Sequence, residues 1–224
     1  MTRESPGRLP SNGQPPWFKG LIRAYFRMAF GRCEIRGIEN VPAEGPLIIA
    51  STHRSYLDPL ILGAFILRPL CFMSKSELFQ NRLLSAFITA FGAFPVDRES
   101  VRGSTFRTAV NLLHQGEVVA VFPEGGIVDS LGEQGFKKGV GMLASMTGAR
   151  VLPIYLSGTN TLFSWPMGLS NKTWMVLHAG ELIEPGENRG RVGRNQISER
   201  VGEKLQELER AFLASRLPED RPNP

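Results

Sequence analysis

Several short runs in this sequence are apolar on every residue, and they constrain the fold more than any other feature. Residues 47–50 read LIIA and residues 118–121 read VVAV. A strand with one face in water alternates apolar and polar side chains, whereas a strand covered by helices on both faces is apolar throughout. Stretches with helical periodicity separate these runs, so the connections contain helices and the strands pair mostly in parallel. The sequence therefore predicts an α/β domain with a mixed, mostly parallel sheet flanked by helices.

A single domain is expected over residues 32–216, since a chain of 224 residues suits one domain of ordinary size. Strand-like runs occupy residues 34–37, 46–52, 70–74, 93–97, 117–122, 151–158 and 174–180. Helices are expected from Pro59, up to Ala90, and over about 103–115, 138–148 and 196–215. Residues 1–16 and 217–224 are rich in proline and polar residues and are predicted to be flexible tails.

Composition excludes several classes of protein. Hydrophobic residues make up 42% of the chain and charged residues 21%, so wholesale disorder is excluded. Two cysteines, Cys33 and Cys71, and three histidines supply neither a disulfide framework nor a zinc site, and we expect no metal and no cofactor. The longest apolar stretch, residues 59–73, contains Arg68 and is shorter than the ~20 apolar residues of a membrane-spanning helix. Because the N-terminus shows no signal-peptide pattern, the sequence predicts a cytoplasmic protein.

The net charge of +5 lies entirely in residues 1–36, which carry seven basic and two acidic residues, while the rest of the chain carries 19 of each. Residues 17–30 have helical periodicity, with one face made of Phe18, Ile22, Tyr25 and Ala29 and another of Lys19, Arg23 and Arg27. Such a helix either docks on the domain or lies on an anionic membrane. We predict the membrane contact, through residues 17–31, on the inner face of the membrane. The side chains expected to insert are Trp17, Phe18, Phe26 and Phe30. No nucleic-acid motif occurs, so nucleic acid is not an expected partner.

The segment STHRSYLDP places two reactive side chains at the end of a predicted strand. His53 follows the run 46–52, and Asp58 comes five residues later, directly before Pro59. Catalytic groups in α/β proteins gather at the carboxyl ends of the strands. One interpretation makes Asp58 the N-cap of a helix and His53 a surface residue. The other folds the turn back so that the carboxylate accepts the Nδ1 proton of His53, which leaves Nε2 as a base for a substrate hydroxyl.

A second segment, VFPEGGIV at residues 121–128, ends another predicted strand with a carboxylate and two glycines. Glu124 is followed by Gly125 and Gly126, which permit positive φ and close approach of the backbone to a ligand. The alternative is an ordinary glycine turn.

Cationic residues mark two more positions. Arg98 follows the run 93–97, where it suits either an anionic ligand or a solvated ion pair with a neighbouring carboxylate. Lys137 and Lys138 stand at a helix start, which suggests an anion shared with the helix N-terminus, although a solvated basic turn fits equally well.

Taken in order, these segments resemble the glycerolipid acyltransferase family whose type member is 1-acyl-sn-glycerol-3-phosphate acyltransferase. The order is H-x4-D, a strand followed by Asp-Arg, F-P-E-G, and a strand with an internal proline, over about residues 36–180. The resemblance makes His53 and Asp58 the catalytic pair. It places the other motifs at Arg98, at Glu124 with Gly125, and at Pro153. It implies transfer of a fatty acyl group from acyl-CoA or acyl-carrier protein to the hydroxyl of a lysophospholipid, with 1-acyl-sn-glycerol 3-phosphate giving phosphatidic acid.

One departure from the family concerns the acceptor. After F-P-E-G the family's third motif usually continues with threonine, arginine and serine, whereas this chain has Gly-Ile-Val at residues 126–128. Arg98, Lys137 and Lys138 would then supply the positive charge for an acceptor phosphate. The alternatives are a lyso-aminolipid or glycerol 3-phosphate as acceptor, or a lipid-binding protein without enzymatic activity.

The residues suit direct transfer without a covalent enzyme intermediate. No G-x-S-x-G elbow occurs, and neither cysteine neighbours a histidine in the sequence. His53 would deprotonate the acceptor hydroxyl as it attacks the thioester carbonyl, while Asp58 fixes the histidine tautomer. The N–H groups of Gly125 and Gly126 are candidate donors to the oxyanion, and Glu124 is expected to order the loop or the acceptor.

Overall fold

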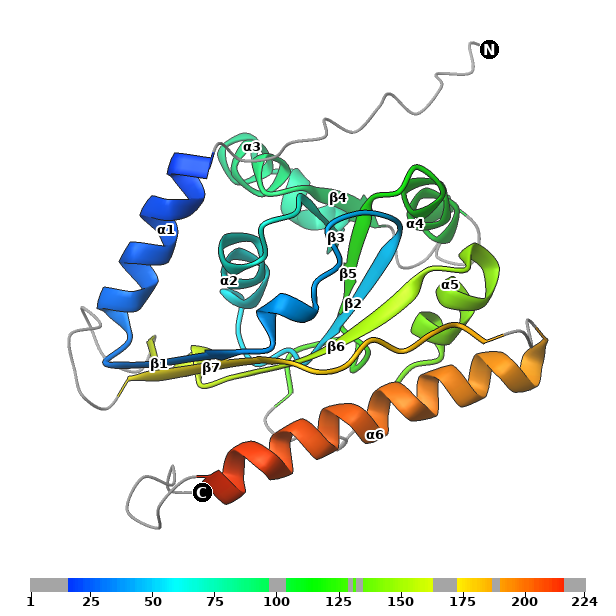
Figure 1. Ribbon diagram of the computed structural model, residues 1–224. Helices are drawn as coiled ribbons and strands as arrows, with labels where there is room; N and C mark the ends of the chain where they lie inside the picture. Colours follow the sequence, from blue (N-terminus) through cyan, green and yellow to red (C-terminus); the bar gives the residue numbers. More distant parts are fainter. Residues whose placement is uncertain are drawn as a thin grey trace.

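The sheet has seven strands in the order β1-β7-β6-β2-β5-β3-β4 (Figure 1). The computed structural model describes residues 16–96, 104–128, 131, 135–162, 173–186 and 190–215. The strands are β1 Arg32–Arg36, β2 Leu47–Ser51, β3 Leu70–Lys75, β4 Ala93–Val96, β5 Val118–Val121, β6 Arg150–Ser157 and β7 Trp174–Ala179. Neighbouring strands are parallel except for β6 with β7. The predicted α/β class with a mostly parallel sheet is confirmed.

The helices fall close to the predicted positions. They are α1 Pro16–Ala29, α2 Asp58–Phe65, α3 Arg82–Ala90, α4 Ser104–His114, α5 Gly139–Thr147 and α6 Arg191–Ser215, with short 3₁₀ turns at Ile38–Asn40, Ser76–Phe79 and Thr159–Leu162. The last helix begins at Arg191 rather than at Gln196. The tails predicted at residues 1–16 and 217–224 lie outside the described residues, apart from Pro16, which begins α1.

The two faces of the sheet have separate hydrophobic cores. Successive residues of a strand point to opposite faces, so Leu47 and Ile49 of β2 belong to one core and Ile48 and Ala50 to the other. Helices α1 and α2 cover the first core, and α4, α5 and α6 cover the second (Figure 1). This double coverage explains why β2 is buried at every position.

Strand β2 lies between β5 and β6, and this neighbourhood prepares the site. Ala50 of β2 pairs with Val121 of β5, and Ser51 pairs with Ile154 of β6. The three strands run in parallel, so the segments that follow them leave the sheet at the same edge. Residues after β2, β5 and β6 therefore meet although they are far apart in the sequence.

Helix α1 packs differently from the sequence-based expectation. Phe26 and Phe30 are buried in the core that α1 shares with α2, so the prediction that they insert into lipid is wrong. Lys19 was expected on a basic outer face, but it is only 6% exposed. Its Nζ donates to the carbonyls of residues 66–68 at 3.0 to 3.2 Å, directly after the end of α2. Buried amines need such partners, and these carbonyls determine which side of α1 faces the domain.

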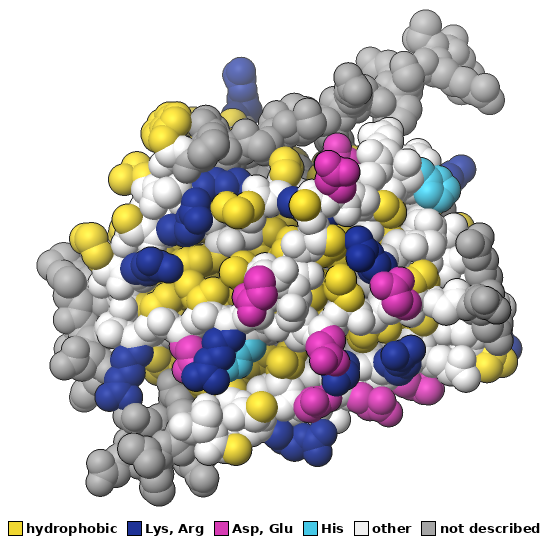
Figure 2. Space-filling model, viewed as in Figure 1, with side chains coloured by type: hydrophobic (Ala, Val, Ile, Leu, Met, Phe, Trp, Pro, Cys, Tyr) yellow, Lys and Arg dark blue, Asp and Glu magenta, His cyan; other side chains and the backbone are white. Residues whose placement is uncertain are grey.

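The outward side of α1 is apolar. Its exposed large hydrophobic side chains are Trp17 (71%), Leu21 (62%), Tyr25 (58%) and Met28 (70%), which we call the α1 apolar stripe. Spacings of three and four residues place them along one side of the helix. Figure 2 shows hydrophobic side chains along the edge of the molecule where α1 lies in Figure 1. Within the described ranges, no helix is long and apolar enough to cross a membrane.

Candidate active site

The turn after β2 brings His53 and Asp58 together. Asp58 Oδ2 accepts a hydrogen bond from His53 Nδ1 at 2.9 Å, and it also accepts from the backbone N–H groups of Arg54 and Ser55 at 2.6 and 2.8 Å. The Asp58 side chain is completely buried, whereas 15% of the His53 side chain is exposed. Of the two interpretations, the structure has the one in which the carboxylate faces the imidazole.

Asp58 is not the N-cap of α2, contrary to one expectation. Leu57 holds the N-cap position without a side-chain hydrogen bond, Asp58 is the first helical residue, and Pro59 follows in the first turn. The carboxylate turns back onto residues 53–55 instead of capping the helix. The carboxylate still lies at the N-terminal end of α2, where the helix dipole attracts a negative charge.

The imidazole of His53 is held on several sides. Because the carboxylate of Asp58 accepts a proton from Nδ1, Nε2 is the unprotonated nitrogen of the neutral ring. The ring stacks on Phe122, with ring centroids 4.0 Å apart and planes at 17°. The His53 backbone N–H donates to Glu124 Oε2 at 2.8 Å, and its carbonyl accepts from the N–H of Val128 at 3.0 Å. The segment after β5 therefore wraps around the histidine.

Glu124 is a buried carboxylate that holds the backbone of the histidine. It is 2% exposed, and burial raises its pKa to about 7, although the hydrogen bond from His53 and the charge of Arg54 act in the opposite direction. Its Oε1 has no hydrogen-bond partner within the described residues. That Glu124 orders the loop or the acceptor stays a prediction.

The two glycines after Glu124 have different roles in the turn. Gly125 has a φ of 79°, and its N–H donates to the carbonyl of Phe122 at 3.0 Å, so this N–H is committed to the turn. The N–H of Gly126 donates to no group in the part of the chain that the structure describes. Of the two candidate oxyanion donors, Gly126 is therefore the one that remains available.

Of the three cations predicted to bind an acceptor phosphate, the structure places Lys137 beside the site. The side chain of Lys137 passes directly over Gly125, so that a Cβ at this glycine would collide with its Nζ, and the Lys137 N–H donates to the carbonyl of Pro123 at 2.8 Å. Lys138 is exposed at the N-cap position of α5. Arg98 lies outside the described residues. Pro153 stands within β6 opposite Ala50 of β2.

Sequence reasoning missed two contacts that reach this turn from distant segments. Thr159 follows β6, and its Oγ1 donates to Asp58 Oδ1 at 2.6 Å. Arg54 donates to the carbonyl of Val128 at 3.1 Å and to Glu209 of α6 at 3.3 Å. The only signal for Thr159 was a polar residue just after a predicted strand, and that signal requires knowing that β6 lies beside β2.

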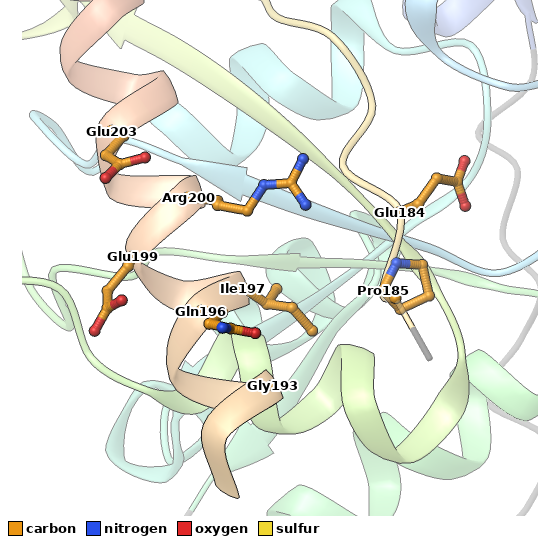
Figure 3. A pocket seen from close by; sticks show the side chains of 9 residues that line it. Glu184, Pro185, Gly193, Gln196, Ile197, Glu199, Arg200 and Glu203 are labelled. Atoms are coloured by element: carbon orange, nitrogen blue, oxygen red, sulfur yellow. The ribbon is translucent and has the colours of Figure 1, made fainter. Parts of the chain in front are cut away.

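A pocket of about 490 Å³ lies between α6 and residues 184–186, away from these segments (Figure 3). Its charged lining residues are Glu184, Glu199, Arg200 and Glu203. Arg200 extends from α6 toward the segment that carries Glu184. Three carboxylates around one guanidinium disfavour an anionic ligand, so this pocket does not suit a phosphate-bearing acceptor.

The sequence of this chain is similar to those of proteins named as acyltransferases. The sequence model of the family described as Acyltransferase matches residues 32–157. The 1-acyl-sn-glycerol-3-phosphate acyltransferase of Bacillus subtilis is 31% identical over 183 residues, which cover 80% of this chain and 89% of the relative. The Streptococcus pneumoniae protein of the same name is 28% identical over 172 residues, which cover 75% of this chain and 62% of that protein.

The fold is shared as well. The crystal structure of the 1-acyl-sn-glycerophosphate acyltransferase of Thermotoga maritima superimposes with a TM-score of 0.68 at 24% identity, over 90% of this chain and 79% of that one. The family match covers more than half of the chain and includes the turns after β2 and β5. This protein therefore belongs to the acyltransferase family and is an enzyme of that type.

Proposed function

We propose that the enzyme transfers a fatty acyl group from acyl-CoA or acyl-carrier protein to the hydroxyl of 1-acyl-sn-glycerol 3-phosphate and so makes phosphatidic acid. The observation that carries this proposal is the His53–Asp58 pair, held at 2.9 Å at the carboxyl end of the central strand. The names of the relatives from B. subtilis and S. pneumoniae support the choice of acceptor.

The proposed reaction uses His53 as a general base. Nε2 takes the proton of the acceptor hydroxyl as its oxygen attacks the thioester carbonyl, and the negative charge of the tetrahedral intermediate is stabilised by the N–H of Gly126. The C–S bond then breaks, and the departing thiolate takes the proton back from the imidazolium. Asp58 stabilises the imidazolium in between. The products are an ester and a free thiol, so atoms and charges balance.

The state of the cysteines supports direct attack without an acyl-enzyme. Burial raises the pKa of the Cys71 thiol to about 11, and burial also raises the pKa of Cys33. A thiol must ionise to act as a nucleophile, so neither cysteine is activated for acyl transfer.

The acceptor phosphate is proposed to bind beside the turn after β5. Lys137 lies over Gly125, which brings an ammonium group next to the loop that wraps His53. A lysine in this place supplies the cation that the Gly-Ile-Val sequence at 126–128 leaves out. Arg98 and Lys138 remain proposed helpers in this role.

The membrane contact is proposed to use the α1 apolar stripe. Trp17, Leu21, Tyr25 and Met28 would enter the interfacial region of the bilayer, and the exposed Arg27 would lie near anionic phosphates. Since α1 packs on α2, which begins with Asp58, this contact would place the site close to its lipid substrates. The enzyme would then work at the inner face of the membrane.

The test is a transfer assay on the purified full chain, with both thioesters crossed against 1-acyl-sn-glycerol 3-phosphate, a lyso-aminolipid and glycerol 3-phosphate. We expect transfer to the first acceptor, and folded His53→Ala and Asp58→Asn proteins that are slower by on the order of 10²- to 10⁴-fold. His114→Ala, which changes an exposed histidine on α4, should turn over like the wild type. Ordinary turnover by folded His53→Ala would contradict the mechanism, and a preference for the lyso-aminolipid or for glycerol 3-phosphate would contradict the proposed acceptor.

A further inference from the structure

The two oxygens of the Asp58 carboxylate have separate partners. Oδ2 accepts from His53 and from two backbone N–H groups of the same turn. Oδ1 accepts from the hydroxyl of Thr159, at 2.6 Å. Both Asp58 and Thr159 are 0% exposed, so neither gains a hydrogen bond from bulk water at this contact. A carboxylate held at one oxygen alone can still rotate about its χ2 bond, whereas donors at both oxygens fix its plane.

The position of Thr159 is set by the sheet. The end of β6 is joined to the segment after β2, because Thr52 Oγ1 donates to the carbonyl of Leu156 at 2.6 Å and accepts its N–H at 2.7 Å. Gly158 then turns the chain with a φ of 78°, at a place where a Cβ would collide with Trp174. Thr159 begins the 3₁₀ turn that follows, so the Thr52–Leu156 hydrogen bonds and the turn at Gly158 together bring its hydroxyl to Asp58.

We propose that Thr159 is a positioning residue for acyl transfer: its hydroxyl fixes the Asp58 carboxylate so that Oδ2 faces His53 Nδ1, and it thereby selects the histidine tautomer with a basic Nε2. This rests on the proposed function. Thr159 lies just beyond residues 32–157, the part of the chain that the family model matches. Because Thr159 is 0% exposed and its hydroxyl donates to Asp58, its effect on the reaction passes through Asp58 and His53.

The physical consequence of losing the hydroxyl follows from the burial. Replacing Thr159 by valine keeps the shape of the side chain but leaves Oδ1 without its donor in a place that water does not reach. Rotation of the carboxylate toward other donors then becomes favourable. Such a rotation weakens its hydrogen bond to the imidazole and its stabilisation of the imidazolium. A ground-state substrate contact is not involved, so the turnover number should fall while KM for both substrates stays the same.

The test compares Thr159→Val with Thr159→Ser, which keeps the hydroxyl, and with Thr161→Val. Thr161 lies in the same 3₁₀ turn, but its hydroxyl donates to the carbonyl of Gly158 at 2.6 Å, bonds to the backbone of Trp174 at 3.2 Å, and has no hydrogen bond with Asp58. We expect kcat to fall about 10- to 100-fold in Thr159→Val, from the strength of a hydrogen bond to a charged group. Thr159→Ser and Thr161→Val should stay within about threefold of the wild type. Thr159→Ala replaces the valine variant if valine prevents folding.

Two further measurements separate a positioning role from a structural one. In the Asp58→Asn background, Thr159→Val should change kcat less than about twofold, because the residue through which it acts is already altered. Nitrogen-15 NMR of the imidazoles reads the His53 tautomer directly, and the chain has only three histidines, so the His53→Ala spectrum assigns the signal. Thr159→Val should move this signal from the Nδ1–H form toward a mixture of tautomers.

The outcomes are distinct. An active wild type with unchanged kcat and tautomer in Thr159→Val overturns the positioning role and leaves the proposed function intact. A fully additive loss of kcat in the double variant also overturns it. If the wild type transfers no acyl group, the proposed function fails, and the tautomer measurement alone then supports or overturns the role of Thr159 toward Asp58.

Discussion

Helix α2 has a buried charge at each end, and the two charges have opposite surroundings. At its start, Asp58 accepts hydrogen bonds from two backbone N–H groups, a threonine hydroxyl and an imidazole. Just beyond its end, Lys19 of α1 donates to the carbonyls of residues 66–68. Both signs agree with the helix dipole, which favours an anion at the N-terminus and a cation at the C-terminus.

The difference between the two ends lies in what each charge can reach. Asp58 contacts the partly exposed His53, so its charge can act on a substrate through that ring. Lys19 meets only backbone oxygens among its hydrogen-bond partners, and burial lowers its pKa, with the positive charge of Arg23 lowering it further. A buried charge is therefore a candidate for catalysis when one of its partners is reactive, and it is a structural clamp when its partners are backbone groups.

At the catalytic end, Glu124 is a second buried carboxylate, and one of its oxygens has no hydrogen-bond partner in the part of the chain that the structure describes. Its pKa rises from 4.5 to about 7 on folding, so the folded state binds the proton more tightly than the unfolded chain. The resulting stability is fully present below pH 4.5 and is lost as the pH rises through about 7. Between pH 5 and pH 8 the ionisation of Glu124 should lower the free energy of unfolding by about 2 to 3 kcal/mol, and Glu124→Gln should remove this pH-dependent loss.

The measurement is urea unfolding of both proteins at pH 5 and pH 8. Relative to the wild type, the free energy of unfolding of Glu124→Gln should be higher at pH 8 than at pH 5 by that amount. Glu117→Gln is the control, since it changes a carboxylate at the start of β5 that lies outside the site. A difference between wild type and Glu124→Gln that is the same at both pH values would show that Glu124 is charged in the folded protein throughout.

Lys19→Met tests the structural end of α2. The substitution removes three hydrogen bonds from a charged donor and leaves the buried carbonyl of Ile66 without its partner, so we expect a loss of about 2 kcal/mol or more in the free energy of unfolding. Arg27→Met, on the exposed side of the same helix, should change it by less than about 0.5 kcal/mol. Turnover of a soluble short-chain acceptor should stay within about twofold in both. Equal stability of the two variants would remove the distinction between the buried and exposed cations of α1.

The smallest effect is expected from substitutions in the α1 apolar stripe, and it concerns binding to membranes. Replacing Leu21 and Tyr25 together by glutamine should lower binding to anionic vesicles about tenfold, because two side chains no longer enter the bilayer. The matched control replaces Val192 and Leu213, which are exposed on α6, and should leave vesicle binding unchanged. Cosedimentation with vesicles of anionic phospholipid measures both. An equal loss in the two double variants would mean that general surface hydrophobicity, and not α1, carries the contact.

The part of the site that the sequence predicted is the part built from short-range contacts. His53 and Asp58 meet within a single turn, so their spacing and the strand before them were enough to suggest the pair. The loop with Glu124 was likewise visible as a glycine-rich segment after an apolar strand.

The rotation of α1 shows where periodicity alone fails. Both the expected face, with Phe18 and Ile22, and the observed α1 apolar stripe are apolar at helical spacing, so the pattern permits either side to face the domain. The choice depends on Lys19 finding three carbonyls after α2 and on Phe26 and Phe30 filling the core. Those partners come from a different segment of the chain, and a helical pattern contains no information about them.

The sequence by itself determined the α/β class and the strands, because each follows from apolar runs, and it offered the His53–Asp58 pair as one of two interpretations of the local turn. The tertiary structure decided which distant groups complete that turn. Thr159 donates to Asp58 across 101 residues of sequence, and Glu209 pairs with Arg54 across 155. Both contacts exist because β6 is the neighbour of β2 in the sheet and because α6 packs against β6. Neighbour order in a sheet is set by the packing of the whole chain, so local pattern could not reveal it.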